Sequence, residues 1–225
     1  NDDVILSKNV VKEFLKIFES GNIAAVQPLI IHLDGYIEHG FDLGFSGIVL
    51  PTIKSLDRDL LDVSVVAGCC VMVPTKIFFE IGMFRGELFW GYDDADFCWR
   101  LHAHGYKCMV LSKAYVIHYG SASWGKKNPL KFYLGVRNWL YCLIKNTSYW
   151  ILIPQIMLLI FILTNLVIYL MKHREYKELL YMFKAIRHVT KILRRGNMRS
   201  RRGLPKFSIL TDARALPIVN RLFVK

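Results

Sequence analysis

The chain has 225 residues, 53% of them hydrophobic, and a formal net charge of +12. This length suits one sizeable globular core with a membrane segment, and it excludes two full enzymatic domains. Residues 1–171 carry 15 basic and 15 acidic side chains, whereas residues 172–225 carry 15 and 3. A basic tail directly after an apolar run favours anionic lipid headgroups as a partner. Nucleic acid is disfavoured, because no nucleic-acid-reading motif accompanies the charge.

The first predicted elements are a helix, a strand and a loop. Apolar residues at three- and four-residue spacing predict a helix over 8–18, ended near Gly21. The apolar run 23–31 predicts a strand, and Pro28 within it favours a strand end or a sheet edge. Residues 34–60 are rich in Gly and Asp, which predicts a long loop with room for one short hairpin.

Short helices and strands then alternate. Residues 61–73 are apolar and β-branched around Gly68, which predicts a buried strand with a bulge or a close backbone approach at the glycine. Two helices and two strands are expected next, over 76–81, 94–104, 106–110 and 114–118. This alternation predicts the α/β fold class.

Residues 149–171 contain no charged side chain. Their length, the aromatic residues near both ends and the flanking cations indicate a transmembrane helix, with a buried core helix as the alternative. The following helix, over 177–194, has one apolar and one basic side, which suits a helix lying on a membrane surface. Lys and Arg tend to stay in the cytoplasm, so we expect a cytosolic tail. The apolar segment would then be re-entrant, bent at Pro154, or a second span would lie upstream.

Five cysteines form no Cys-x-x-Cys pair, and a bond between adjacent Cys69 and Cys70 would be strained. They fit neither a disulfide framework nor a zinc site. Buried free thiols are the simplest account, which places the globular part in the cytoplasm.

Two acidic clusters are candidates for chemistry: Asp2-Asp3, and Asp93-Asp94 with Asp96 two residues on. Adjacent carboxylates repel each other, so they are exposed, share a cation, or hold one member protonated for proton transfer. Each cluster alone is also explained as the solvated or capped start of a helix. Asp96 and Arg100, four residues apart, predict a helix salt bridge.

Short motifs stand in a definite order between residues 67 and 146. They are A-G-C-C-V-M-V-P, I-G-M-F, F-W-G-Y-D-D-A-D-F-C-W-R-L, G-Y-K, V-I-H-Y-G-S-A-S and R-N-W-L-Y-C-L-I-K-N. This series resembles the second half of family 2 glycosyltransferases, in their rhamnosyltransferase-like branch with the GT-A fold. The resemblance implies a partial GT-A domain over 1–146, a transmembrane or re-entrant helix over 149–171, and a basic, partly amphipathic-helical tail over 172–225. It also implies a base- and ribose-binding half upstream, without which the chain is expected to be inactive.

The resemblance assigns roles to four acidic residues and one histidine. Asp94 matches the catalytic base of an inverting displacement, and Asp93, where the family more often has Glu, would help to bind the acceptor or position the loop. Asp3 matches the metal-binding aspartate, and Asp2 would lie at the donor diphosphate. His118 matches a metal or diphosphate ligand, with a structural histidine as the alternative.

Four further residues are candidates from their types and places. Trp90 is predicted to stack on an acceptor sugar, or to be a core aromatic. Gly68 would let the backbone approach the acceptor, or would form a bulge without function. Arg137 and Lys145 are expected near the membrane, where they would meet a lipid-linked phosphate or serve as interfacial anchors.

The predicted function is an inverting transfer of a sugar from a nucleotide-diphosphate donor to a lipid-linked or cell-surface glycan. Mg²⁺ or Mn²⁺ would offset the charge that grows on the leaving diphosphate. Two alternatives remain: a non-catalytic membrane-associated scaffold that keeps the fold, and a basic-tail protein that binds membranes or nucleic acid.

Overall fold

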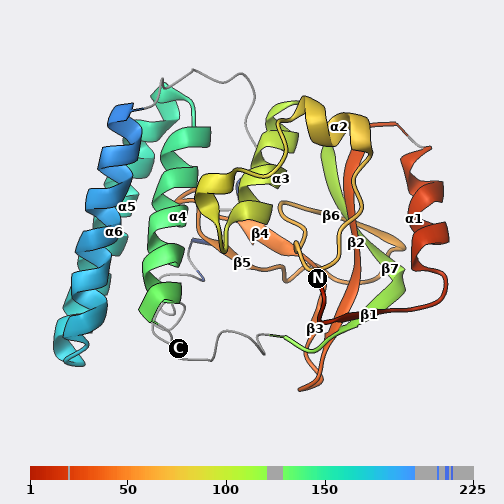
Figure 1. The fold of residues 1–225 in the computed structure, drawn as a ribbon, viewed down its shortest axis with the longest axis horizontal. Helices are drawn as coiled ribbons and strands as arrows, with labels where there is room; N and C mark the ends of the chain where they lie inside the picture. Colours follow the sequence, from red (N-terminus) through yellow and green to blue (C-terminus); the bar gives the residue numbers. More distant parts are fainter. Residues whose placement is uncertain (20, 121–128, 196–206, 208–210, 213, 215–225) are drawn as a thin grey trace.

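The computed structural model describes residues 1–19, 21–120, 129–195, 207, 211–212 and 214. A mixed sheet has helices on both of its sides, and three long helices stand together beside it (Figure 1). The predicted α/β class is therefore confirmed. The motif residues 121–123 and most of the tail beyond 195 lie outside the described residues.

The strands are β1 (Val4–Leu6), β2 (Ile23–His32), β3 (Ile37–Glu38), β4 (Phe41–Leu43), β5 (Val49–Pro51), β6 (Leu60–Val63) and β7 (Lys107–His118). The helices are α1 (Val10–Phe18), α2 (Thr75–Glu80), the short 3-10 helix η1 (Gly86–Leu88), α3 (Asp93–Ala103), α4 (Pro129–Asn146), α5 (Tyr149–Lys172) and α6 (Tyr176–Arg195).

The sheet is built around the parallel pair β2 and β7. Its order is β1-β7-β2-β3, with β6 also paired to β7, and all pairings other than β2 with β7 are antiparallel. Cys108 and Val110 of β7 face the core under α3 and α4, whereas Met109 and Leu111 face the core under α1. This alternation follows from the two-residue period of a strand, and it fixes two apolar faces.

Pro28 lies inside a central strand, so the prediction of a strand end or edge was wrong. β2 runs between β7 and β3, and its pairing with β7 changes register between Pro28 and Leu29. β7 has three extra residues at this point, because Pro28 pairs with Leu111 and Leu29 pairs with Tyr115. The irregularity accommodates a proline, which has no N–H to donate to the ladder.

The prediction of two strands over 106–110 and 114–118 was wrong, because both segments belong to the single strand β7. The irregularity in β7 lies between them. The segment 34–60 contains the predicted hairpin, β4 with β5, but it also contributes β3 to the main sheet. The strand predicted over 61–73 is regular only in β6, and it continues as isolated bridges at Val65 and Met72. The predicted helices over 8–18, 76–81 and 94–104 are confirmed as α1, α2 and α3.

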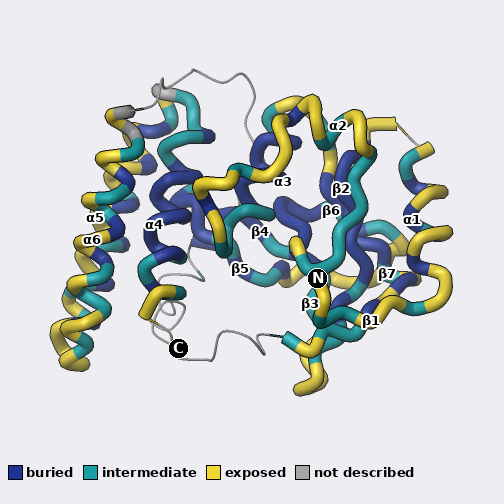
Figure 2. The backbone as a smooth tube through the Cα atoms, in the orientation of Figure 1, coloured by how far each residue is buried: buried dark blue, intermediate teal, exposed yellow. Residues whose placement is uncertain are grey.

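The three long helices α4, α5 and α6 form the other side of the molecule. α4 is buried along most of its length, whereas α5 and α6 are buried on one side only (Figure 2). α5 continues through Pro154 without a break, and 28% of its most apolar window is buried. It is long and apolar enough to cross a membrane, and most of its surface is open, unlike that of a buried core helix.

The basic region has more contacts with the protein than its composition predicts. α6 buries Met182, Ala185 and Val189 in the core it shares with α4 and α5, whereas Leu180 and Phe183 of its predicted apolar side are exposed. Beyond α6, the Asp212 carboxylate accepts hydrogen bonds from the backbone nitrogens of Phe45 (2.5 Å) and Ser46 (3.0 Å). Part of the tail therefore docks on the loop between β4 and β5.

Candidate active site

The site lies at the edge of the sheet where the parallel strands β2 and β7 end. His32 and His118, the last residues of these strands, are register partners. Antiparallel β1 begins at the same edge, because Val4 pairs with His118, and it therefore brings Asp3 there. Ligands in open α/β sheets bind outside the carboxyl ends of the strands, so this edge is the expected place for a substrate.

Asp3 and His118, both predicted as metal ligands, lie together. His118 Nε2 is 3.3 Å from Asp3 Oδ2. Asp3 Oδ1 and His118 Nδ1 are buried and have no hydrogen-bond partner among the described residues. One oxygen and one nitrogen therefore remain available to a ligand.

Asp94 lies in the first turn of α3, after a turn in which Gly91 and Tyr92 both have positive φ angles (72° and 64°). Its Oδ2 accepts a hydrogen bond from the backbone nitrogen of Gly68 (3.1 Å), and its Oδ1 accepts one from Ala95 (2.7 Å). Burial, followed by the charge of Asp93, raises the pKa of Asp94 to about 6, although both N–H groups lower it. Asp94 is thus a fixed carboxylate with a pKa close to neutral.

Gly68 connects Asp94 to the start of the chain. A Cβ atom at Gly68 would lie 3.4 Å from Asp94 Cβ, so the backbone approaches the carboxylate closely. The next residue, Cys69, accepts a hydrogen bond from the Asn1 nitrogen through its carbonyl oxygen (2.9 Å). The acidic pair of α3 and the segment that carries Asp3 therefore meet at one loop.

His32 and Glu38 belong to this edge and were missed by the sequence reasoning. His32 Nε2 is 3.5 Å from Glu38 Oε2, and the rings of His32 and His118 are 5.2 Å apart between centroids. Burial, followed by the charge of Asp94, raises the pKa of Glu38 to about 7. The signal was the Asp34-Gly35 turn, which predicts a hairpin that would place His32 and Glu38 near each other.

The other predicted site residues differ in their exposure and their contacts. Asp2 is exposed, and Asp93 is half-buried beside Asp94. The Trp90 ring lies over α4, with Lys131 Nζ 5.6 Å from the ring centroid. Arg137 is buried, and its Nη2 donates to the carbonyl oxygens of Glu87 (2.7 Å) and Leu88 (2.9 Å). A lipid phosphate would have to compete with these carbonyl oxygens for the hydrogen bonds of the Arg137 guanidinium.

Within the described residues, no group of three or more His, Cys, Asp or Glu side chains is arranged to hold a metal ion by itself. Two protein donors, Asp3 and His118, fit a cation that takes its other ligands from a diphosphate and water, as Mg²⁺ commonly does. The chemistry of the pair therefore suits a substrate-bound cation rather than a closed structural site.

Comparison with known proteins decides the family. The sequence pattern of "Glycosyl transferase family group 2" matches residues 1–186. The chain belongs to this family. The match extends through α4 and α5 into α6, beyond the domain boundary predicted at residue 146.

This chain is similar to two other proteins over part of their lengths. It is 26% identical over 106 residues to the low-salt glycan biosynthesis hexosyltransferase Agl10 of Haloferax volcanii, a stretch that covers 44% of this chain and 34% of that protein. It also resembles the crystal structure of GalNAc-T7 with UDP, GalNAc and Mn²⁺, at 14% identity and a TM-score of 0.47, over 62% of this chain and 29% of that one. The chain thus spans about a third of each of these proteins.

α4 anchors the acidic loop that precedes α3. Asn138 Nδ2 donates to three carbonyl oxygens of the loop, those of Leu88, Trp90 and Gly91, at 2.7 to 2.8 Å. Asn138 is fully buried. One amide therefore fixes the loop that leads into Asp93 and Asp94.

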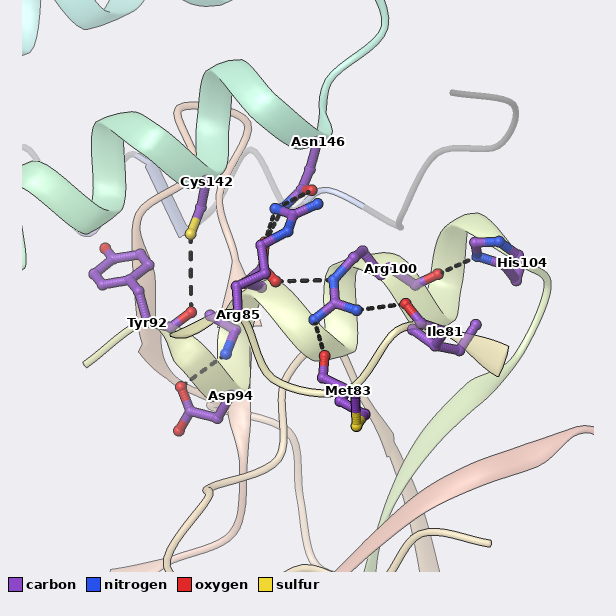
Figure 3. A network of polar contacts seen from close by, with 11 residues as sticks. Ile81, Met83, Arg85, Tyr92, Asp94, Arg100, His104, Cys142 and Asn146 are labelled. Carbon is purple, nitrogen blue, oxygen red and sulfur yellow. Dashed lines mark hydrogen bonds and ion pairs between the residues drawn. The ribbon is translucent and has the colours of Figure 1, made fainter. Parts of the chain in front are cut away.

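A second network lies behind Asp94 (Figure 3). Asp96 is fully buried and accepts hydrogen bonds from Arg85 Nη1 (2.5 Å), Arg100 Nε (2.8 Å) and Asn146 Nδ2 (2.8 Å). The predicted salt bridge between Asp96 and Arg100 is confirmed. Arg100 also donates to the carbonyl oxygens of Ile81 and Met83, so the network ties α2, α3 and α4 together.

All five cysteines are free, but the prediction of buried thiols was wrong for Cys69 and Cys70, which are only partly buried. Cys98, Cys108 and Cys142 are buried in the core. Cys69 lies at the site, where burial, followed by the charge of Glu38, raises the pKa of its thiol to about 12. A thiol with this pKa stays protonated at neutral pH and is a poor nucleophile.

Proposed function

We propose that this glycosyltransferase moves a hexosyl-type sugar from a nucleotide-diphosphate donor to a lipid-linked or cell-surface glycan, with inversion and with Asp94 as the base. One observation carries the proposal: Asp94 is fixed by Gly68, and its loop meets the segment that bears Asp3. The relative Agl10 is named as a hexosyltransferase of glycan biosynthesis, which supports this substrate class.

Asp94 performs the proton transfer in this scheme. In its ionised form it accepts the proton of the acceptor hydroxyl as that oxygen attacks the anomeric carbon. The N–H groups of Gly68 and Ala95 hold the carboxylate in one orientation before the acceptor arrives. Asp93, Trp90 and Gly68 surround the acceptor side.

Asp3 and His118 would hold Mg²⁺ or Mn²⁺, and Asp2 would lie at the donor diphosphate. When bound, the ion offsets the negative charge that grows on the leaving diphosphate. The unpartnered Asp3 Oδ1 and His118 Nδ1 atoms support this assignment, because buried polar atoms without partners are rare in folded proteins.

The membrane is the proposed location of the acceptor. α5 exposes large apolar side chains along one side, including Met157, Ile160 and Phe161. The basic tail would face anionic lipids on the cytoplasmic side, where free thiols also persist. We propose that α5 keeps the site near the membrane, and that Lys145 lies close to its surface. Sedimentation of the protein with anionic vesicles should be lost when Met157 and Ile160 are both replaced by Lys.

The experiment is a donor and metal screen of the protein, expressed with any sequence that precedes Asn1 in its gene. UDP-, GDP- and dTDP-linked hexoses are supplied with Mg²⁺ or Mn²⁺, and release of the nucleoside diphosphate is measured. At least one donor should be turned over, and EDTA should abolish that turnover. The variant Asp3→Asn should raise the Mn²⁺ concentration needed for half-maximal rate. Absence of turnover with every donor would favour a non-catalytic scaffold.

A further inference from the structure

Four buried polar atoms at the strand ends have no hydrogen-bond partner among the described residues. They are Asp3 Oδ1, His118 Nδ1, His32 Nε2 and Glu38 Oε1. Buried polar groups in folded proteins are nearly always paired, and each exception needs an explanation, such as a catalytic role or a bound water or ion. Asp3 and His118 are explained by the proposed cation. His32 and Glu38 are not used by the mechanism above.

Glu38 interacts with groups at both ends of the site. Through His32 it adjoins His118, at the proposed cation end. Glu38 also lies close enough to Asp94 and to the Cys69 thiol, next to Gly68, for charge interactions with them: the charge of Asp94 helps to raise the pKa of Glu38, and that of Glu38 helps to raise the pKa of Cys69. The hairpin of β2 and β3 holds it there, because Glu38 pairs with Ile30 and the backbone nitrogen of His32 donates to the Tyr36 carbonyl (2.9 Å).

The geometry of a displacement at the anomeric carbon determines which part of the donor lies between the cation end and the Asp94 end of the site. The anomeric carbon must sit between the leaving diphosphate oxygen and the attacking hydroxyl. Asp3 and His118 mark the diphosphate side, and Asp94 marks the hydroxyl side. A group placed between them therefore lies beside the ring of the transferred sugar.

We propose that Glu38, with His32 beside it, binds hydroxyl groups of the transferred sugar and so determines which sugar the enzyme accepts. This inference rests on the proposed function. A carboxylate oxygen accepts a hydrogen bond from a sugar hydroxyl, and an imidazole nitrogen accepts or donates one according to its tautomer. Two such groups on one hairpin can form hydrogen bonds with two neighbouring hydroxyls of the sugar. Sites built to bond a hydroxyl reject analogues that lack it, because the buried partner is then left unpaired.

The test compares binding of a nucleoside diphosphate with binding of the matching nucleotide sugar, both with Mn²⁺, by titration calorimetry. The probe is the donor that the wild-type protein turns over. The variant Glu38→Gln should bind the sugar-free nucleotide like the wild type and bind the nucleotide sugar about tenfold more weakly. The exposed residue Glu80 provides the matched control, and Glu80→Gln should change neither affinity.

Deoxy analogues of the donor keep the test independent of the folding of any variant. The wild-type protein should bind at least one monodeoxy donor about tenfold more weakly than its parent sugar, and Glu38→Gln should not discriminate between that pair. Equal binding of all deoxy donors by the wild type, or normal discrimination by Glu38→Gln, would overturn the inference while leaving the proposed function intact. Failure of the wild type to turn over any nucleotide sugar would overturn both.

Discussion

Asp94 owes its proposed role to its surroundings. Burial and the Asp93 charge raise its pKa to about 6, while the N–H groups of Gly68 and Ala95 stabilise the ionised form. A carboxylate with this pKa is mostly ionised at neutral pH, yet it is more basic than an ordinary aspartate. These opposing effects suit a base that acts near pH 7.

The pH dependence of kcat/KM follows from this pKa. Since Asp94 must be ionised to accept a proton, the rate should be constant above about pH 7 and should fall about tenfold per pH unit below about pH 6. The pH profile is measured for the wild type and for Glu38→Gln. In the variant, the titration of Glu38 no longer contributes to the profile. An acid limb near pH 4, the ordinary range of an aspartate, would contradict the assignment.

Asp94, Asp3 and His118 could be proposed as site residues from the sequence because each stands in a short motif of definite order. His32 and Glu38 could not be predicted in the same way. Their neighbourhood depends on pairing between β2, β3 and β7, and β7 lies about 75 residues from β2 along the chain. The Asp34-Gly35 turn indicates the hairpin of β2 and β3, but the register between β2 and β7 cannot be read from the local sequence.

At the scale of elements, the helices other than α4 and η1 were predictable, and the sheet only in part. α1 was predicted from apolar spacing and a glycine stop, and α3 from acidic residues in its first turn and a glycine stop, which are local signals. β2 was misplaced because Pro28 normally marks an edge, and a three-residue irregularity in its partner β7 relieves that constraint. Because this irregularity lies in a strand that is distant in the sequence, the residues next to Pro28 do not reveal it.

The loop before α3 depends on α4 through Asn138. Asn138→Ala should destabilise the protein by about 2–3 kcal/mol, because the carbonyl oxygens of Leu88, Trp90 and Gly91 each lose one donor, although Leu88 still accepts from Arg137. Turnover should fall as well, since the loop leads into Asp93 and Asp94. Urea unfolding measures the first effect and donor turnover the second.

Asn165 provides the control for this substitution. Its side chain is on the exposed side of α5 and donates to the Phe161 carbonyl in the same helix. Asn165→Ala should change stability by less than about 0.5 kcal/mol. Equal effects at Asn138 and Asn165 would show that the loop contacts contribute little.

At the scale of the whole molecule, the tail contacts the α/β domain. Asp212 caps the loop between β4 and β5, and Phe207 packs edge-on against Trp99. The fit is close at Gly44, where an added Cβ would lie 2.7 Å from Asp212 Oδ1. The tail was predicted as a lipid-facing segment, and composition alone could not show this docking because it rests on one of its three acidic residues.

Release of this contact should expose the tail to protease. Asp212→Ala removes the acceptor, and Gly44→Ala blocks its approach, so both variants should be cleaved beyond α6 faster than the wild type. Limited trypsin digestion followed by mass spectrometry measures the rate. Asp57→Ala, at an exposed loop position, should digest like the wild type. Unchanged cleavage in both test variants would argue against docking in solution.

The central claim is that Asp94 is the base, and the variant Asp94→Asn tests it most directly. The amide keeps the size of the side chain but cannot accept the proton, so the transfer rate should fall by about 10²- to 10⁴-fold. The affinity for the donor, measured in parallel, should stay within about twofold, and Asp57→Asn should match the wild type in both. A transfer rate within about tenfold of the wild type, or a loss of donor affinity equal to the loss of rate, would contradict the account.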